Sequence, residues 1–269
     1  MSKSLTDAQR RSYEQAGVLF PIRVLSQDET GRFRTATDEL ESLFGGKPRT
    51  VEVRQMHLHF HWAYELATHP CILDAIEDIL GPELLIWATE LFSKHPGDAA
   101  LSIGWHRDRP YMGFASSHIV TAWVALRPST AANGCMRAFL EPGRRHAIRS
   151  PGQSAKPVND RDVIDVELHE GEMSLHDPDI LHGSNPNPSN EKRTGFVIRY
   201  LTPDARPLAG KPPVVRARGH DICSDFCLIE PRLESRAEDA VAGMKRSASL
   251  HLEAILHNLK VTDAHRASD

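Results

Sequence analysis

Cysteine is scarce in this sequence, which contains only four cysteines among 269 residues. They are Cys71, Cys135, Cys223 and Cys227, and no two of them form a C-x-x-C pair. So few thiols in so long a chain cannot supply the disulfide framework of a small secreted domain. We therefore expect the cysteines to be reduced.

Long apolar runs and a strong net charge are also missing. No run approaches the length that crosses a bilayer, and residues 1–6 lack the apolar core of a signal peptide. The formal net charge of −4 gives no basic field of the kind that nucleic-acid-binding proteins carry. We expect a soluble, cytoplasmic protein whose partners include neither a membrane nor nucleic acid.

The hydrophobic content of 40% is enough to bury a substantial core, and we expect one domain spanning residues 1–269. Signals that begin a helix stand at Thr6, at the capping box Ser26 with Glu29, and at Pro70. These signals predict a helical lead-in over about residues 5–81. The second helix has apolar residues that helical spacing places on one face: Phe33, Ala36, Leu40, Leu43 and Phe44.

From residue 84 onward, the pattern changes to short β runs separated by turn-rich stretches. They cover residues 84–92, 118–126, 136–140, 163–168, 172–176 and 195–201. This order predicts a mainly β member of the α+β class. Its core, about residues 84–218, would be a double-stranded β-helix, which is a cupin-like jelly roll, buttressed by N-terminal and C-terminal helices.

The C-terminal segment, about residues 231–260, is expected to be helical. Its apolar residues are Leu250, Ile255, Leu256 and Leu259. Such a face would pack on the outside of the domain or on a second subunit, so the sequence is compatible with a homodimer.

A candidate metal site begins at His106 and Asp108. In an extended strand alternate side chains share a face, so these two residues would point at one ion while Arg107 points away. A third ligand, His182, would come from a strand distant in sequence. Two imidazoles and one carboxylate can occupy one face of an octahedral ferrous ion and leave three adjacent positions open. The set therefore favours a site that activates oxygen.

Arg193 follows the third ligand at the start of a β-rich run. A planar guanidinium at this place could hold a carboxylate through two hydrogen bonds. The combination indicates a dicarboxylate co-substrate beside the metal.

These residues belong to an ordered set of blocks in which the chain, over about residues 5–218, resembles the phytanoyl-CoA dioxygenase family of Fe(II)/2-oxoglutarate oxygenases. The blocks are Gly81-Pro82, Lys94-His95-Pro96, Trp105-His106-Arg107-Asp108, Thr121-Ala122-Trp123-Val124-Ala125-Leu126, Asn133-Gly134-Cys135, and His182-Gly183-Ser184 with Arg193.

The resemblance implies a role for each matching residue. His106, Asp108 and His182 would hold Fe(II), Arg193 and Ser184 would bind the distal carboxylate of 2-oxoglutarate, and Trp123 would line the co-substrate pocket. The implied cofactors are Fe(II), 2-oxoglutarate and O₂. Halogenating relatives carry Gly or Ala where this chain has Asp108, so chlorination is disfavoured.

Four further polar residues are candidates for contact with the substrate: Gln55, Glu90, Lys94 and Arg107. A charged group that faces a cavity needs a partner, and a polar substrate could provide it. Two of them also have an ordinary alternative. Glu90 could be an edge carboxylate paired with an arginine, and Arg107 a solvated ion-pair partner.

His57, His59 and His61 alternate and would share one face of a strand. Without a carboxylate or cysteine nearby, they are better explained as histidines on a polar face, one of which could touch the substrate, than as a metal site. His176, close before His182, is expected to have a supporting or packing role.

The expected reaction is hydroxylation of an unactivated C–H bond in a small polar or anionic metabolite, with release of succinate and CO₂. Two alternatives stay open. One is a cupin-like metal-dependent isomerase or hydrolase, which leaves Arg193 without a role. The other is a non-catalytic module that binds metal or 2-oxoglutarate.

Overall fold

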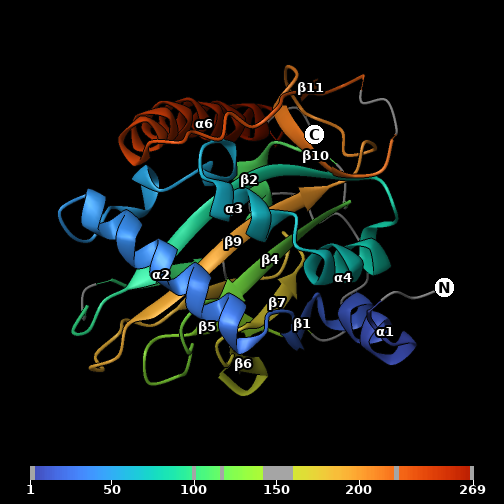
Figure 1. The fold of residues 1–269 in the computed structure, drawn as a ribbon. Coiled ribbons are helices and arrows are strands. Elements are labelled where there is room, and N and C mark those ends of the chain that lie inside the picture. The colour runs from blue at the N-terminus through green and yellow to red at the C-terminus, as the bar shows by residue number, and fades with distance from the viewer. Residues whose placement is uncertain (1–3, 99–100, 116–117, 142–159, 221–223, 267–269) are drawn as a thin grey trace.

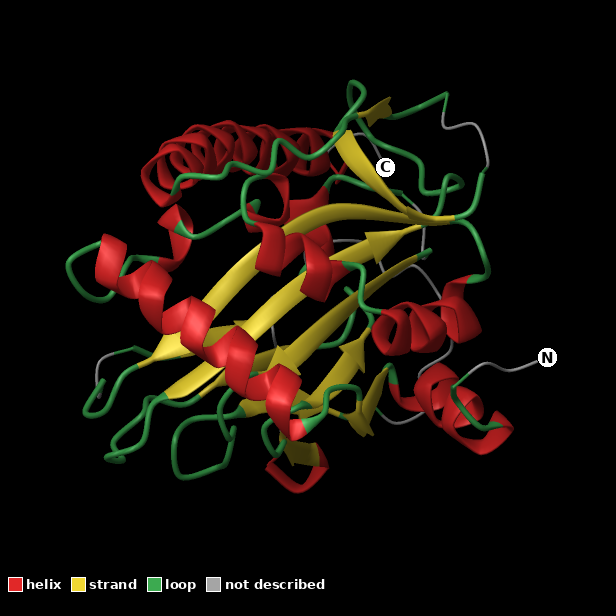
Figure 2. Cartoon of the chain, in the orientation of Figure 1, coloured by secondary structure: helices red, strands yellow, loops and turns green. Residues whose placement is uncertain are grey.

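Two β-sheets form the centre of the fold, and helices lie against the larger sheet (Figures 1 and 2). The computed structural model describes residues 4–98, 101–115, 118–141, 160–220 and 224–266. Within these residues the larger sheet contains, in spatial order, β1 (Val18–Arg23), β7 (Glu172–His176), β4 (Ile119–Ala125), β9 (Arg193–Leu201), β2 (Leu84–Lys94), β10 (Pro213–Arg218) and β11 (Cys227–Leu228). The smaller sheet contains β3 (Ile103–His106), β8 (His182–Ser184), β5 (Met136–Phe139) and β6 (Val163–Val166).

Neighbouring strands are antiparallel except for β10 and β11, which are parallel. The helices are α1 (Asp7–Ala16), α2 (Gln27–Leu43), α3 (His61–Ala67), α4 (Pro70–Leu80), α5 (Arg109–Met112) and α6 (Ala237–Arg266). This mixture of helices and mostly antiparallel strands confirms the α+β class.

The first helices begin where the sequence predicts. The Thr6 hydroxyl accepts from the Gln9 amide and caps α1, and the Ser26 hydroxyl accepts from the Glu29 amide and caps α2. Each capping box satisfies amide groups that have no partner inside the helix. Gly17 ends α1 in the left-handed region with φ 72°, which glycine adopts without strain.

Along the central strands, side chains that face the helices alternate with side chains that face the smaller sheet. On β4, Val120, Ala122 and Val124 belong to the large apolar cluster that also contains Phe33 of α2 and Ile76 of α4. The residues between them on β4 face the opposite side, as do the corresponding residues of β9. One face of the larger sheet is therefore closed by helices, and the other is available to the smaller sheet and the pocket.

Two predictions about the lead-in are wrong. Strand β1 lies inside the segment expected to be helical, where it pairs with β7 at the edge of the larger sheet. Pro21 makes this short run a poor match to a strand pattern, although an edge strand tolerates proline. On α2, Leu43 is 44% exposed, whereas Thr37 is fully buried, because the buried stripe follows the turn of the helix rather than every apolar residue.

The three alternating histidines do not form a strand. His57 lies in a short 3₁₀ helix, Met56–Leu58, and His61 begins α3. His57 is buried against the Thr89 hydroxyl, 3.0 Å from its Nδ1, and His59 Nε2 lies 2.8 Å from the hydroxyl of Ser247 on α6. His61 is exposed, so these imidazoles do not share a face.

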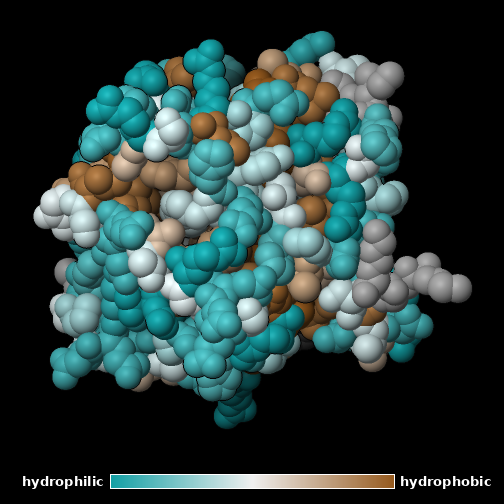
Figure 3. All heavy atoms as spheres, viewed as in Figure 1, coloured by the Kyte–Doolittle hydropathy of each residue, from teal (hydrophilic) through white to brown (hydrophobic). Residues whose placement is uncertain are grey.

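The C-terminal helix packs on its own chain. Val241 and Met244 of α6 are buried in the large apolar cluster, whereas Leu250 and Leu256 are exposed. Among the described residues, no helix is both long and apolar enough to cross a membrane. Hydrophilic side chains cover most of the face in Figure 3, and the hydrophobic ones form separate patches. The described cysteines Cys71, Cys135 and Cys227 are free, and Cys223 lies outside the described residues.

The two leucines of α2 offer a matched test of this packing. Leu40→Ala, at a side chain that is 1% exposed, is expected to lower the free energy of unfolding by about 2–5 kcal/mol, because it leaves a cavity against the sheet. Leu43→Ala should change it by less than about 0.5 kcal/mol, since that side chain already contacts solvent. Urea unfolding followed by circular dichroism measures both, and equal losses would contradict the orientation of α2.

Candidate metal centre and cavity

Strands β3 and β8 bring two histidines together. His106 and His182 are direct partners in the antiparallel ladder, and their ring centroids lie 4.2 Å apart. Asp108 Oδ1 is 3.4 Å from His106 Nε2 and 3.9 Å from His182 Nε2. The three candidate ligand atoms all lie within 4.8 Å of one another. One ion could therefore contact all three side chains.

The backbone reaches this arrangement in a different way from the one expected. Strand β3 ends at His106, and Asp108 has helical dihedral angles just before α5. The Asp108 amide donates to the carbonyl of Pro178 at 2.9 Å, which ties the carboxylate to the loop that leads into β8. The expectation that His106 and Asp108 share an extended strand is wrong, although their side chains do converge.

The ring orientations of the two histidines and the ionised state of Asp108 suit a divalent metal, although the contact with Asp108 raises the pKa of His106 against the effect of burial. Nδ1 of His106 donates to the Gly104 carbonyl at 2.9 Å, and Nδ1 of His182 donates to that of Ile180 at 3.1 Å. Both Nε2 atoms are then free to bind a metal. Burial lowers the pKa of His182 to about 4, so this imidazole is neutral at pH 7. Burial would raise the pKa of Asp108, but Arg199 and the two histidines hold it well below its usual range. The residues fit Fe(II), whose preferred ligands are imidazole nitrogens and carboxylate oxygens.

Arg193 lies on the same cavity and is 3% exposed. Its Nε donates to the Ser129 hydroxyl at 3.0 Å, and its guanidinium carbon lies 4.5 Å from the centre of the Trp123 ring. Burial lowers its pKa to about 10, so it still carries its charge at pH 7. In the described part of the chain no carboxylate is paired with it. A buried unpaired guanidinium is costly unless an anion binds beside it.

The Trp123 ring occupies space that is open only because the residue opposite it, Gly195, has no side chain. A Cβ added to Gly195 would lie 1.9 Å from the ring, so glycine is required where β9 passes Trp123. Trp123 and Ala125 share one apolar cluster with Val197 of β9, so they lie on the face of the sheet opposite the helices. Trp123 is therefore a wall of the cavity.

Ser184 and Lys94 meet beneath the same side of the cavity. Lys94 Nζ donates to the Ser184 hydroxyl at 2.7 Å and also to the backbone carbonyls of Gly134 and Asn185. Burial and the nearby charge of Arg193 lower the pKa of Lys94 to about 7. Because the Ser184 oxygen accepts from Lys94, its own hydrogen is free to point into the cavity. Lys94 therefore lies on the same side of the metal ligands as Arg193.

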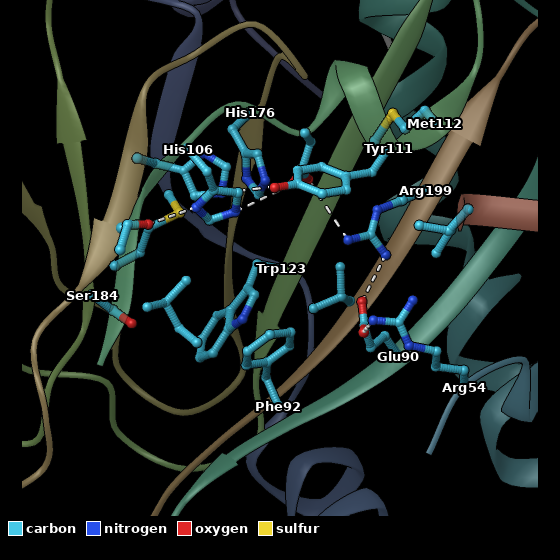
Figure 4. A pocket seen from close by; sticks show the side chains of 18 of the residues that line it. Arg54, Glu90, Phe92, His106, Tyr111, Met112, Trp123, His176, Ser184 and Arg199 are labelled. Carbon is cyan, nitrogen blue, oxygen red and sulfur yellow. Dashed lines mark hydrogen bonds and ion pairs between the residues drawn. The ribbon is translucent and has the colours of Figure 1, made fainter. Parts of the chain in front are cut away.

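On the other side of the metal ligands, Glu90 lies between two arginines (Figure 4). Glu90 Oε1 is 2.5 Å from Arg54 Nη2, and Glu90 Oε2 accepts from Arg199 Nη1 at 2.9 Å. Arg199 Nη2 also lies 3.6 Å from Asp108 Oδ2. Glu90 thus faces the cavity and is paired with arginines, but it is not an edge carboxylate, because β2 lies between β9 and β10 in the sheet.

Sequence analysis missed Arg199, although a signal for it was present. It follows Arg193, Gly195 and Val197 at every second position of β9, so the alternation that places Arg193 on the inner face also places Arg199 there. A charged residue between Ile198 and Tyr200, both fully buried, must have a partner on that face.

Three of the four candidate substrate residues do not line the cavity: Lys94, Arg107 and Gln55. Arg107 points away from the metal ligands and donates to the Asp179 carbonyl and to Glu141, the latter at 2.5 Å. Gln55 is buried behind the wall, where its amide nitrogen lies 3.0 Å from His251 Nδ1. His176 is buried beside His182, with ring centroids 5.2 Å apart, and lies outside the group of metal-binding residues.

The cavity has a volume of about 640 Å³, and its lining includes the three candidate metal ligands, Arg193, Ser184, Trp123, Glu90, Arg54 and Arg199. Its far wall is formed by α6, whose position sequence analysis left open between the outside of the domain and a second subunit. Leu252, Ile255 and Leu259 of α6 line it, together with Tyr111 and Met112 of α5. Figure 4 shows Ser184 and His106 on one side and Arg54 with Glu90 on the other. The metal ligands therefore lie between a side with an unpaired cation and a side closed by α6.

The chain is similar to known proteins in both sequence and structure. The sequence model of the phytanoyl-CoA dioxygenase (PhyH) family matches residues 13–195. A probable phytanoyl-CoA dioxygenase of Caenorhabditis elegans is 24% identical, with coverage of 74% of this chain and 76% of that protein. A probable alpha-ketoglutarate-dependent hypophosphite dioxygenase of Stutzerimonas stutzeri is 28% identical, with coverage of 70% and 68%.

Among solved structures, the non-heme monooxygenase ThoJ in its apo form superposes with a TM-score of 0.82 at 30% identity, with coverage of 94% of this chain and 99% of that one. These relatives act on small molecules or are non-heme oxygenases, and the described residues include the His-Asp-His group that such enzymes need. The chain belongs to the phytanoyl-CoA dioxygenase family and is an enzyme of the Fe(II)- and 2-oxoglutarate-dependent dioxygenase type, with Fe(II), 2-oxoglutarate and O₂ as its cofactors.

Proposed function

We propose that the protein hydroxylates an unactivated C–H bond of a small polar or anionic metabolite and converts 2-oxoglutarate to succinate and CO₂. The observation that carries this proposal is the buried Arg193, which has no carboxylate partner among the described residues and shares one cavity with His106, Asp108 and His182. A cupin-like isomerase or hydrolase would have no use for such a cation.

In this proposal His106, Asp108 and His182 hold Fe(II), which together with 2-oxoglutarate supplies the oxidising chemistry when bound. Arg193 and the Ser184 hydroxyl bind the distal carboxylate of 2-oxoglutarate. Lys94 orients Ser184 and adds positive charge beneath it, so we place Lys94 at the co-substrate rather than at the substrate. Trp123 supports the Arg193 guanidinium and keeps water from that wall.

Residues of both sheets line one cavity, which supports our assignment of the core to a double-stranded β-helix, a jelly-roll, cupin-like architecture, within one oxygenase domain. A cytoplasmic location, the absence of a nucleic-acid partner and a homodimer stay predictions from the sequence. Substitution of Asp108 by Gly or Ala would be needed to resemble the halogenating members, so hydroxylation is favoured over chlorination.

The metal assignment can be tested without a substrate. Addition of Fe(II) and then 2-oxoglutarate in the absence of O₂ should produce a weak visible charge-transfer band. His106→Ala should abolish this band, because it removes one of only three protein ligands. His61→Ala, at an exposed histidine outside the cavity, serves as the control and should leave the band unchanged. No band in the unmodified protein would overturn the proposed function.

The role of Arg193 predicts a selective loss of co-substrate affinity. Arg193→Gln should raise the dissociation constant for 2-oxoglutarate by about 30-fold or more, since hydrogen bonds to charged groups contribute roughly 1.5–3 kcal/mol each. Fe(II) affinity should be little changed. Anaerobic titration of the same band measures both quantities. Arg32→Gln, which removes an exposed ion pair with Glu65, is the control, and equal effects of the two substitutions would count against the assignment.

A further inference from the structure

The α6 side of the cavity contains more positive than negative charge. Glu90 is shared by Arg54 and Arg199, and the remaining ion-pair partner of Arg199 is Asp108. Asp108 is itself assigned to the metal, whose charge it would partly neutralise. Glu90 therefore balances only one of the two guanidinium groups, and the cluster suits an additional anion.

Arg54 has an unused donor at this place. Its side chain is 16% exposed and lines the cavity, yet among the described residues its Nε has no hydrogen-bond partner. A buried N–H without an acceptor is destabilising by roughly 1–3 kcal/mol. The exposed part of the same guanidinium, which lines the cavity, can donate to an oxygen atom of a bound molecule.

His251 of α6 offers a second donor to the same space. Gln55 Nε2 lies 3.3 Å from the Trp87 carbonyl, which can only accept, so this atom is the amide nitrogen. The same nitrogen lies 3.0 Å from His251 Nδ1, which must then be the acceptor. The ring proton of His251 is therefore on Nε2. Burial, with the charges of Arg54 and Arg199, lowers the pKa of His251 to about 3 and keeps the ring neutral.

The backbone of Gln55, which orients its amide toward His251, has an unusual conformation. Its φ is 58°, and it is the one non-glycine residue with a positive φ among those the structure describes. Such a conformation costs of order 1–3 kcal/mol and persists where the surroundings require it. Here it directs the amide of Gln55 to both Trp87 and His251.

Beyond these donors the wall is apolar. Leu252, Ile255, Leu256 and Leu259 recur at helical spacing on α6 and line the cavity, and the Trp87 ring packs against the His251 ring at 4.9 Å between centroids. A ligand held by Arg54 and His251 would place its remaining atoms against this surface. The cavity thus has one polar point of attachment and a larger apolar surface.

We propose that Arg54 and His251 form a recognition site for a carboxylate group of the substrate, and that α6 covers the apolar remainder of that molecule. Two separate N–H donors match the two oxygens of a planar carboxylate, and the excess positive charge of the cluster favours the ionised form. Arg199 positions Arg54 through Glu90 and links the site to Asp108. This assignment rests on the function proposed above, because the substrate must lie beside the metal ligands.

The test uses the full chain loaded with Fe(II) and saturating 2-oxoglutarate under argon, with octanoate and octanamide as matched probes. Calorimetric titration should show octanoate binding at least about tenfold more tightly than octanamide. Arg54→Gln should weaken octanoate binding by about 10–100-fold and leave octanamide binding within about twofold. His251→Phe keeps a ring against Trp87, removes the donor and should also reduce the preference for the acid.

Arg49→Gln is the control, because Arg49 is exposed in the same segment and pairs only with Glu52 among the described residues. The proposal is overturned if the acid and the amide bind the unmodified protein equally, or if both Arg54→Gln and His251→Phe retain the full preference. Octanoate that abolishes the 2-oxoglutarate band would occupy the Arg193 side instead and would also overturn it. A persistent band together with no acid preference refutes this site alone, whereas absence of the band refutes the proposed function.

Discussion

The pairing of β3 with β8 is the constraint on which the metal centre depends. It places His106 opposite His182 in the ladder, and both side chains are fixed further by backbone carbonyls that accept from their Nδ1 atoms. The strands can approach this closely because Gly183 has no side chain. A Cβ there would lie 2.8 Å from the Ile103 carbonyl oxygen. Asp108 joins the pair only because its amide is tied to the loop before β8.

The inner face of the larger sheet has to accommodate several charges that an apolar interior would oppose. Arg193 and Arg199 lie on one strand, and Glu90 and Lys94 lie on the neighbouring strand. Glu90 and Arg199 stabilise each other, whereas Lys94 is satisfied by neutral oxygens and Arg193 by a hydroxyl and an aromatic ring. Arg193 therefore has no carboxylate partner among the described residues, whereas on the other side of the metal ligands Glu90 offsets one of the two arginines, Arg54 and Arg199. This asymmetry explains why a dianionic co-substrate is assigned to the Arg193 side.

Sequence was sufficient for the parts of this arrangement that depend on local patterns. The capping boxes of α1 and α2, the central strands and the inner face of β4 follow from short-range spacing, and the order of His106, Asp108, His182 and Arg193 predicted the group that the structure brings together. The turn at Asp108 was not predictable, since its partner is a carbonyl distant in sequence. The same reason applies to His57 and His59, whose neighbours come from β2 and α6.

The position of α6 is the clearest example of a feature that local sequence patterns do not predict. Its apolar residues predicted a buried face but not what that face covers, because the cavity is assembled from strands throughout the chain. His251 carried no signal of its own, and only its contacts with Gln55 and Trp87 reveal its role. Both Arg199 and His251 lie beyond residues 13–195, the part that the family shares, whereas the metal ligands lie within it. The chemistry of oxidation is thus built from the shared region. The wall opposite it is formed largely by α6, which lies outside that region.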